Sequence, residues 1–137
     1  MDLIVIAGPT ASGKTAVGIE VARALNGEII SVDARQVYRH MNIGTAKPTP
    51  SEQAAVPHHL IDIVDPDEMI DAADYARRAA DTIEQILGRE KLPVLVGGAG
   101  FYLEALFSGF SPIPAISEET RARVQDEADF DLQGCHA

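Results

Sequence analysis

GPTASGKT, at residues 8–15, decides the fold of this chain. The stretch fits the phosphate-binding pattern G-x-x-x-x-G-K-[ST] at every fixed position. Its glycines let backbone N–H groups turn toward phosphate oxygens, and the start of the following helix adds partial positive charge. Lys14 supplies a full charge, and the Thr15 hydroxyl can ligate a Mg²⁺ ion held by the phosphates. We therefore predict a polyphosphate site, and its ligand could be ATP, GTP or a prenyl diphosphate. The eight predicted binding residues are Gly8, Pro9, Thr10, Ala11, Ser12, Gly13, Lys14 and Thr15.

The residues around this loop alternate between strand and helix patterns. A wholly apolar run, Leu3–Ala7, predicts a strand buried on both faces before the loop. Helical spacing predicts a helix over Thr15–Leu25 that stops at Asn26-Gly27. Three more strands are expected over Glu28–Val32, His59–Val64 and Pro93–Val96, and three more helices over Ala72–Leu87 (capped by Asp71), over Phe101–Phe107 and after Ser117. The alternation predicts an α/β fold, a kinase-like parallel sheet with flanking helices around the P-loop, and four strands leave an uncovered edge.

Composition bounds the class of protein. The 137 residues suffice for one domain with a proper core. The formal net charge of −10 argues against nucleic-acid binding, but the stretch from Ser31 to Pro50 has three bases against one acid, Asp33. This basic strip could meet phosphates, because the field at a site depends on local charge, and its bases are Arg35, Arg39 and Lys47.

Nothing in the sequence reads as a membrane span or an export signal. The apolar run Leu3–Ala7 is too short to span a bilayer, and Asp2 precedes it without a basic segment. The single cysteine, Cys135, excludes an internal disulfide. We therefore expect a cytoplasmic protein without membrane contact.

Two segments follow predicted strands at the edge of the sheet where ligands bind. Ser31-Val32-Asp33 ends one strand, so Asp33 is expected near the phosphate loop, where its carboxylate either receives a proton from an attacking group or caps a turn. Gly97-Gly98-Ala99-Gly100 ends another, where glycines permit close approach to a ligand or simply turn the chain into a helix. His58-His59 lacks partners at metal-ligand spacing and is interpreted as structural, as are three tyrosines: Tyr38, Tyr75 and Tyr102.

Several segments together resemble the tRNA dimethylallyltransferase family, also called tRNA isopentenyltransferases. In order these are GPTASGKT, SVDARQVYRHMNIGTAKP, PHHLIDIVDP, PVLVGGAGFYLEAL, SPIP and ETRAR. The resemblance extends from about Leu3 to Arg123, and the stretch from Asp33 to Pro48 is its most specific part. It implies a P-loop kinase-like core with a helical insertion that grips the tRNA anticodon arm.

The resemblance also implies the roles of individual residues. Dimethylallyl diphosphate, with Mg²⁺, would bind at Thr10–Thr15, and Asp33 would accept the proton from N6 of adenosine 37 as that nitrogen attacks the allylic carbon. Six residues would contact the tRNA or the reaction centre: Asp33, Ala34, Arg35, Gln36, Ala99 and Arg121.

The chain departs from the family pattern at two of these positions. Family members usually carry Thr where this chain has Ala99, and Ser where it has Ala34. The Thr hydroxyl is thought to donate to the bridging oxygen of the leaving group, so its absence could cost about 1–3 kcal/mol of transition-state stabilisation.

Family members are also longer, and their later part carries a diphosphate-binding arginine and most of the tRNA-gripping surface. We therefore expect residues 1–114 to form an incomplete α/β core, and residues 115–137 to begin the helical tRNA-binding insertion or to be a truncated tail. By itself the chain is expected to be poorly active or inactive.

Three other functions stay open. A small-molecule or nucleoside kinase would use the same loop with ATP, although no Lys or Arg lies between Lys47 and Arg77 to supply an arginine-rich lid. A prenyltransferase acting on free AMP or ATP is the second alternative, and a chain that only binds phosphate is the third. The oligomeric state cannot be inferred.

Overall fold

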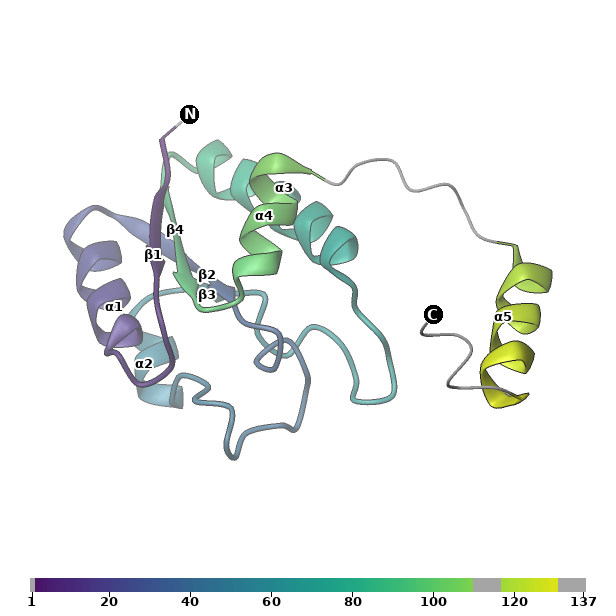
Figure 1. Cartoon of the computed structure of the whole chain (residues 1–137). Helices are drawn as coiled ribbons and strands as arrows, with labels where there is room; N and C mark the ends of the chain where they lie inside the picture. Colours follow the sequence, from purple (N-terminus) through teal and green to yellow (C-terminus); the bar gives the residue numbers. More distant parts are fainter. Residues whose placement is uncertain (1, 110–116, 131–137) are drawn as a thin grey trace.

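A single parallel sheet forms the centre of the molecule (Figure 1). The computed structural model describes residues 2–109 and 117–130. Within them the sheet has four strands in the order β1-β4-β2-β3, and every neighbouring pair is parallel. The strands are β1 (Ile4–Ala7), β2 (Gly27–Val32), β3 (His58–His59) and β4 (Leu92–Gly97). The predicted α/β class with a parallel sheet is confirmed.

Helices cover both faces of this sheet. On one face α1 (Lys14–Ala24) packs against the strands, with α2 (Pro50–Ala55) beside it, and on the other face lie α3 (Ala72–Gly88) and α4 (Gly100–Ser108). The last helix is α5 (Glu118–Phe130), whose side chains are exposed from Glu118 to Asp126. Among the described residues no helix is long and apolar enough to cross a membrane.

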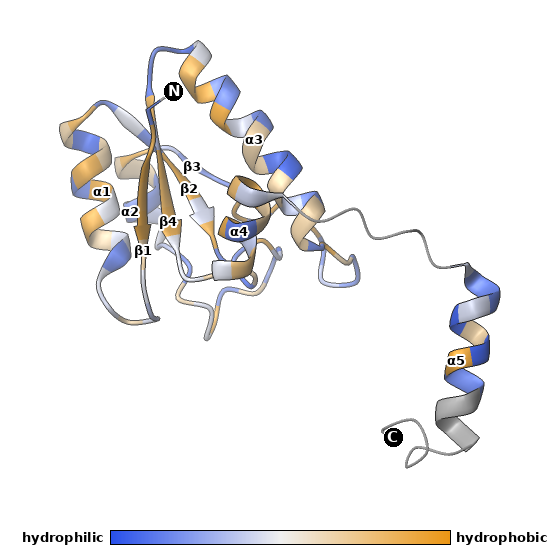
Figure 2. Ribbon diagram, turned by 45° about the horizontal axis from the view of Figure 1, so that its top comes forward, coloured by the Kyte–Doolittle hydropathy of each residue, from blue (hydrophilic) through white to orange (hydrophobic). Residues whose placement is uncertain are grey.

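Helices cover both faces of the sheet, and β2 and β4 accordingly carry apolar residues on both faces, with Glu28 and Ser31 as the polar residues of β2 (Figure 2). Successive side chains of a strand point to opposite faces, which divides the core in two. One cluster lies against α1 and the other against α3 and α4. From the two strands, the first cluster contains Ile29, Val94 and Val96, and the second contains Ile30, Val32 and Leu95.

The prediction that the first strand is buried on both faces is wrong. The Val5 side chain is 40% exposed, and Ala7 is exposed as well. The physical reason is the strand order, which places β1 at an edge with β4 as its one neighbour in the described sheet. The expected uncovered edge is therefore present at β1.

The third strand is far shorter than predicted. We expected His59–Val64, but β3 consists of His58 and His59 alone. Leu60 and Asp62 both adopt left-handed backbone angles, with φ of 60° and 56°, and such angles end the extended conformation. Val64 retains an isolated parallel bridge to Tyr38.

A short helix that the sequence analysis did not predict, α2, follows the long loop after β2. Thr49 and Glu52 form a reciprocal capping box, and Pro50 occupies the first turn. The spacing T-x-x-E with proline after the threonine is a known helix-start signal, so the sequence did contain the information.

The remaining helices match their predictions closely. Asp71 caps α3, accepting a hydrogen bond from the Asp74 N–H at 2.7 Å. Ser117 likewise precedes α5, and its hydroxyl accepts from the Thr120 N–H at 3.2 Å. The domain boundary predicted at residue 114 and the segment SPIP lie outside the described residues, as does Cys135.

Gly97 stands where two strands approach most closely. A Cβ atom at this position would lie 2.0 Å from the Val32 carbonyl oxygen, far inside any real contact. The close approach lets that oxygen accept from the N–H groups of Gly98 and Ala99, both at 3.1 Å. The end of β4 is thereby joined to the end of β2, directly below the predicted ligand edge.

Gly97→Ala is expected to destabilise the fold by about 3 kcal/mol or more, because backbone atoms cannot yield the space. Urea unfolding followed by circular dichroism measures the change. Gly88→Ala is the matched control, since a Cβ there meets nothing within 4 Å. At this helical position alanine should stabilise by about 0.5–1 kcal/mol. Equal stability of the two variants would contradict the steric argument.

Candidate functional site

The phosphate loop joins β1 to α1 at the carboxyl edge of the sheet. Gly13 caps α1 in a left-handed conformation, with φ of 83°. Ala11 also has a left-handed φ of 63°, which is uncommon for a residue with a side chain. The Ser12 hydroxyl donates to the Pro9 carbonyl at 2.8 Å, and the Lys14 ammonium folds back to donate to the same carbonyl. The loop is thus held in a tight curve at the start of a helix, as phosphate binding requires.

A cavity of about 360 Å³ opens beside this loop, and we call it the phosphate cavity. Residues 10–15 form one wall. The opposite wall consists of strand residues and of the loop that follows β2, with Ser31, Asp33, Gln36, Ala46, Pro48 and His58 among its members. The cavity therefore joins the predicted phosphate site to the end of β2.

A second cavity of about 340 Å³ lies next to the first, and we call it the outer cavity. Three residues line both cavities: Thr10, Asp33 and Gly98. The outer cavity is also lined by Ala34, Arg35 and Ala99, three of the residues expected to contact tRNA. Four of those six residues therefore line the outer cavity, counting Asp33.

The other two predicted contacts lie differently. Arg121 is an exposed residue of α5 and lines neither cavity. Gln36 lines the phosphate cavity, but its side chain is buried and its amide is hydrogen-bonded within the chain. Their roles toward tRNA stay predictions.

Asp33 sits where the two cavities meet. Its Oδ1 accepts hydrogen bonds from the backbone N–H groups of Arg35 at 2.8 Å and Gln36 at 3.2 Å. Within the described structure its Oδ2 has no hydrogen-bond partner. The side chain therefore caps the turn after β2 with one oxygen, as one of the two interpretations predicted, and its role as a proton acceptor stays a prediction.

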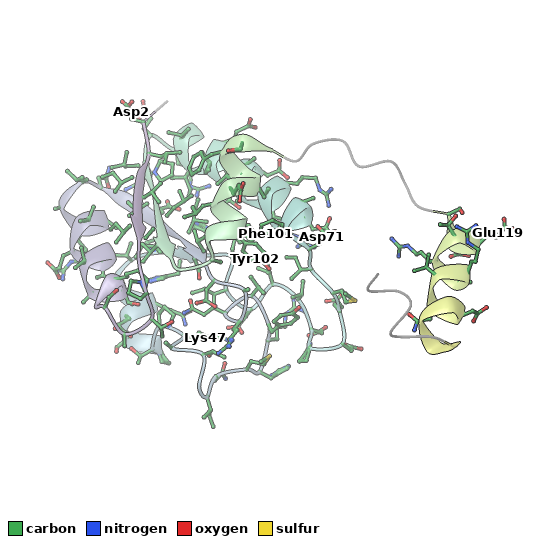
Figure 3. All side chains as sticks on the ribbon, viewed as in Figure 1. Asp2, Lys47, Asp71, Phe101, Tyr102 and Glu119 are labelled. Carbon is green, nitrogen blue, oxygen red and sulfur yellow. The ribbon has the colours of Figure 1, made fainter. Side chains whose placement is uncertain are left out.

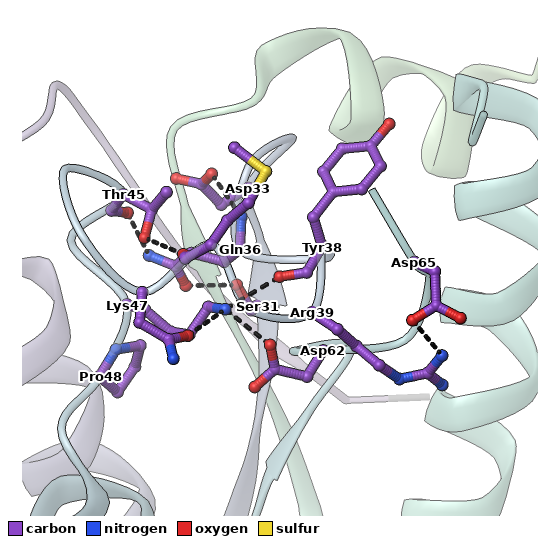
Figure 4. A network of polar contacts seen from close by, with 12 residues as sticks. Ser31, Asp33, Gln36, Tyr38, Arg39, Thr45, Lys47, Pro48, Asp62 and Asp65 are labelled. Atoms are coloured by element: carbon purple, nitrogen blue, oxygen red, sulfur yellow. Dashed lines mark hydrogen bonds and ion pairs between the residues drawn. The ribbon is translucent and has the colours of Figure 1, made fainter. Parts of the chain in front are cut away.

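The loop after β2 is closed by internal polar contacts (Figure 4). Lys47 Nζ donates to the Tyr38 carbonyl at 2.9 Å, to Asn42 Oδ1 at 3.0 Å and to Asp62 Oδ1 at 2.6 Å. The Lys47 side chain is only 5% exposed, and Figure 3 places it among the loops at the edge of the sheet that holds the phosphate loop.

The predicted basic strip is therefore wrong for Lys47, because all three ammonium hydrogens are donated to groups of the protein itself. Arg39 forms an ion pair with Asp65, with 3.1 Å between Nη1 and Oδ1. Arg35 is exposed at the outer cavity and keeps the location that phosphate contact needs.

The two adjacent histidines have different environments. His59 Nε2 lies 2.7 Å from Glu28 Oε2, and the Arg89 guanidinium lies 2.7 Å from the same oxygen. The hydrogen bond from Arg89 lowers the pKa of the Glu28 carboxyl. Among the described residues no group of three or more His, Cys, Asp and Glu side chains could hold a metal ion. The contact of His59 to Glu28 joins β3 to β2, which agrees with a structural interpretation of His59.

His58 was not predicted to be near the site, yet it lines the phosphate cavity. Its Nδ1 lies 2.7 Å from the Val56 carbonyl oxygen, and its buried Nε2 has no partner within the described ranges. Burial lowers the pKa of His58, which favours a neutral ring. No local pattern could have indicated this position, because it results from the pairing of β3 with β2.

Two of the tyrosines form a packed pair under the site. The rings of Tyr75 and Tyr102 stack with centroids 4.1 Å apart and an interplanar angle of 13°. The Tyr75 hydroxyl donates to the Ser31 carbonyl at 2.8 Å, and burial raises the pKa of Tyr75 above its ordinary value. Tyr38 packs partly buried against the same core. The prediction that all three are packing residues is confirmed.

A strand, this glycine-containing loop and a helix define the P-loop class of α/β phosphate-binding proteins. The family model described as IPP transferase matches residues 36–137. The chain belongs to the IPP transferase family.

Known relatives agree with this membership. A tRNA dimethylallyltransferase of Roseiflexus sp. is 57% identical over 129 residues, which is 93% of this chain and 42% of the relative. The crystal structure of the full-length tRNA isopentenylpyrophosphate transferase from Bacillus halodurans superimposes with a TM-score of 0.79 at 44% identity, covering 95% of this chain and 43% of that one. A eukaryotic dimethylallyltransferase solved acting on tRNA gives a TM-score of 0.78 at 34% identity, covering 85% and 30%. The chain therefore spans less than half the length of these relatives.

Lys14→Ala should weaken the binding of pyrophosphate by roughly tenfold to a hundredfold, because a charge-assisted hydrogen bond is worth about 1.5–3 kcal/mol. Isothermal titration calorimetry with this chain measures the affinity. Arg23→Ala is the matched control, since Arg23 lies on the same helix with its side chain 62% exposed and paired to Glu20. Equal affinity of the Lys14 variant and the wild type for pyrophosphate would show that the phosphate loop does not bind it.

Proposed function

We propose that this chain carries the diphosphate site and the catalytic base of a tRNA dimethylallyltransferase, which transfers a dimethylallyl group from dimethylallyl diphosphate to N6 of adenosine 37 in tRNA. One observation supports this most: Asp33 lies in the wall shared by two adjoining cavities. One cavity contains the phosphate loop and the other opens beside it. A group transfer needs the donor and the acceptor to meet with the base within reach of the acceptor, and two adjoining cavities with Asp33 in their shared wall allow this.

The donor would bind in the phosphate cavity with its diphosphate on residues 10–15. Backbone N–H groups, the start of α1 and Lys14 would compensate its charge. A magnesium ion fits this arrangement, since Thr15 lines the cavity at the first turn of α1 and the phosphates themselves supply oxygen ligands. When bound, the ion would neutralise the charge that develops on the departing diphosphate.

The acceptor adenine would enter through the outer cavity. Because the base must leave its stack to reach a protein site, a single-stranded loop such as the anticodon loop is the favoured acceptor. Arg35, exposed at this cavity, is available to a backbone phosphate. We also infer a cytoplasmic location, because the proposed acceptor is a tRNA.

The chemical step then follows from these positions. The lone pair of N6 forms a bond to the allylic carbon C1 while the bond from C1 to the bridging oxygen breaks, and diphosphate departs with the electron pair. The nitrogen loses one proton, which the Asp33 carboxylate accepts. Because the Arg35 and Gln36 N–H groups occupy Oδ1, we assign the proton to Oδ2.

Asp33→Asn should slow prenyl transfer by about 10²–10⁴-fold, the usual contribution of a general base. The amide oxygen of asparagine can still accept from the N–H groups of Arg35 and Gln36, so the turn should survive. The assay is single-turnover transfer to an anticodon stem-loop, in a chimera that joins this chain to the remaining length of the Roseiflexus relative.

Asp33→Ala removes both the base and the cap, so comparison of the two variants separates chemistry from turn stability. A near-normal rate in Asp33→Asn would leave Asp33 as a cap only. Phosphate transfer from ATP without any prenyl transfer by the unaltered chimera would instead favour the kinase alternative.

Ala99→Thr should raise the transfer rate of the same chimera by roughly fivefold to a hundredfold, if a restored hydroxyl donates to the leaving oxygen with about 1–3 kcal/mol. Ala99→Val is the matched control, because valine has the shape of threonine without the hydroxyl. A similar rate in both variants would show that another donor, such as a backbone N–H, already serves the leaving group.

A further inference from the structure

Gln36 occupies a central place between Asp33 and the loop that lines both cavities (Figure 4). Its backbone N–H donates to Asp33 Oδ1 at 3.2 Å. Its side-chain Nε2 donates to the carbonyl oxygens of Thr45 at 3.3 Å and Ala46 at 3.0 Å. Its Oε1 accepts from the Ser31 hydroxyl at 2.9 Å. One residue therefore contacts the predicted base, the end of β2 and the far side of the loop.

Burial makes these contacts strong constraints. Gln36 is 9% exposed and Thr45 is 7% exposed. A buried amide that loses its hydrogen-bond partners is not compensated for the water that it gave up on folding. This free-energy cost keeps the Gln36 side chain in its observed conformation. The Gln36 carbonyl also accepts from the Asp62 N–H at 3.0 Å, which connects this residue to the segment after β3.

The part of the loop that Gln36 holds is also part of the cavity walls. Ala46 lines the phosphate cavity, whereas Thr45 lines the outer cavity beside Asp33. A second buried side chain, Lys47, closes the same loop from its other end through Tyr38, Asn42 and Asp62. The wall is thus fixed at two points, and only Gln36 of these two also contacts the Asp33 turn.

We infer that Gln36 is a positioning residue: it couples the orientation of the Asp33 carboxylate to the loop wall formed by Thr45 and Ala46. The inference rests on the proposed function for its catalytic meaning, since Asp33 is the proposed base. In this role the Gln36 amide faces the protein interior rather than the tRNA. Displacement of the loop would rotate or free the carboxylate, and order in the loop keeps Oδ2 between the two cavities.

The test uses this chain and needs no activity. Gln36→Met keeps the length of the side chain but removes all three of its hydrogen bonds. The matched control is Gln53→Met, because Gln53 Nε2 also donates to a carbonyl near this loop, that of Pro48 at 2.8 Å, without a contact to Asp33. Nuclear magnetic resonance gives two signals: solvent exchange of the Arg35 and Gln36 amides, and the carboxyl carbon shift of Asp33.

In Gln36→Met we expect the exchange of these two amides to quicken by about two- to tenfold, the range for loss of one ordinary hydrogen bond. The Asp33 carboxyl signal should shift as well, while Gln53→Met should alter neither. A change confined to Thr45 and Ala46, or no change at all, would overturn the inference and leave Gln36 as a loop anchor.

If Gln36→Met does not fold, Gln36→Glu answers the same question. It keeps an acceptor for Ser31 and replaces the amide donor with a carboxyl oxygen that faces the Thr45 and Ala46 carbonyl oxygens, so this side of the loop is released while the Ser31 contact remains. Because these signals need no substrate, they remain decisive even if the chimera transfers no prenyl group. Failure of the proposed function and failure of this inference are therefore distinguishable.

Discussion

The contact between Gly97 and the Val32 carbonyl is the constraint on which the site depends. Two N–H groups, those of Gly98 and Ala99, converge on that one oxygen, and the Gly8 N–H reaches the Gly97 carbonyl at 3.3 Å. The ends of β1, β2 and β4 are thereby fixed to one another. The phosphate loop and Asp33 directly follow two of these ends, and Ala99 lies two residues after the third, so their relative positions derive from backbone bonds rather than from side chains. Rigid backbone of this kind is what holds reacting groups in place before a substrate arrives.

The regions below and above the joined ends of β1, β2 and β4 are held together by different interactions. Below the strand ends, the stacked Tyr75 and Tyr102 fill the space between the sheet, α3 and α4, and the Tyr75 hydroxyl satisfies a strand carbonyl. Above them, the loop after β2 is built from side-chain contacts to backbone carbonyls. The first region stabilises the fold through burial of apolar surface. In the second region polar side chains fix the shape of the loop, and the ammonium of Lys47 is buried for that purpose instead of facing solvent.

Features that depend on neighbouring residues could be predicted from the sequence, whereas features that depend on contacts between distant residues could not. The loop between β1 and α1, the alternation of strands with helices and the Asp71 cap depend on contiguous residues, and each lies where it was predicted. The end of β3 depends on left-handed backbone angles at Leu60 and Asp62, and leucine is a residue type that rarely adopts such angles. The burial of Lys47 depends on Asp62, fifteen positions away, and the place of His58 depends on strand pairing. Contacts of this range leave no periodic signal, whereas the capping box of α2 was a local signal that we overlooked.

Glu28 makes the stability of the sheet sensitive to acid, and this sensitivity extends to the phosphate cavity. This one buried carboxylate holds His59 on β3 and Arg89 beyond the end of α3, and the hydrogen bond from Arg89 lowers its pKa below the ordinary value of 4.5. A carboxyl whose pKa is lower in the folded state stabilises the fold above the unfolded pKa, and that contribution is lost as the pH falls through the folded value. Protonation of Glu28 would therefore loosen β3 before the strands in the centre of the sheet. Since His58 belongs to that strand and lines the phosphate cavity, acid would loosen the cavity wall through Glu28, a residue that lines neither cavity.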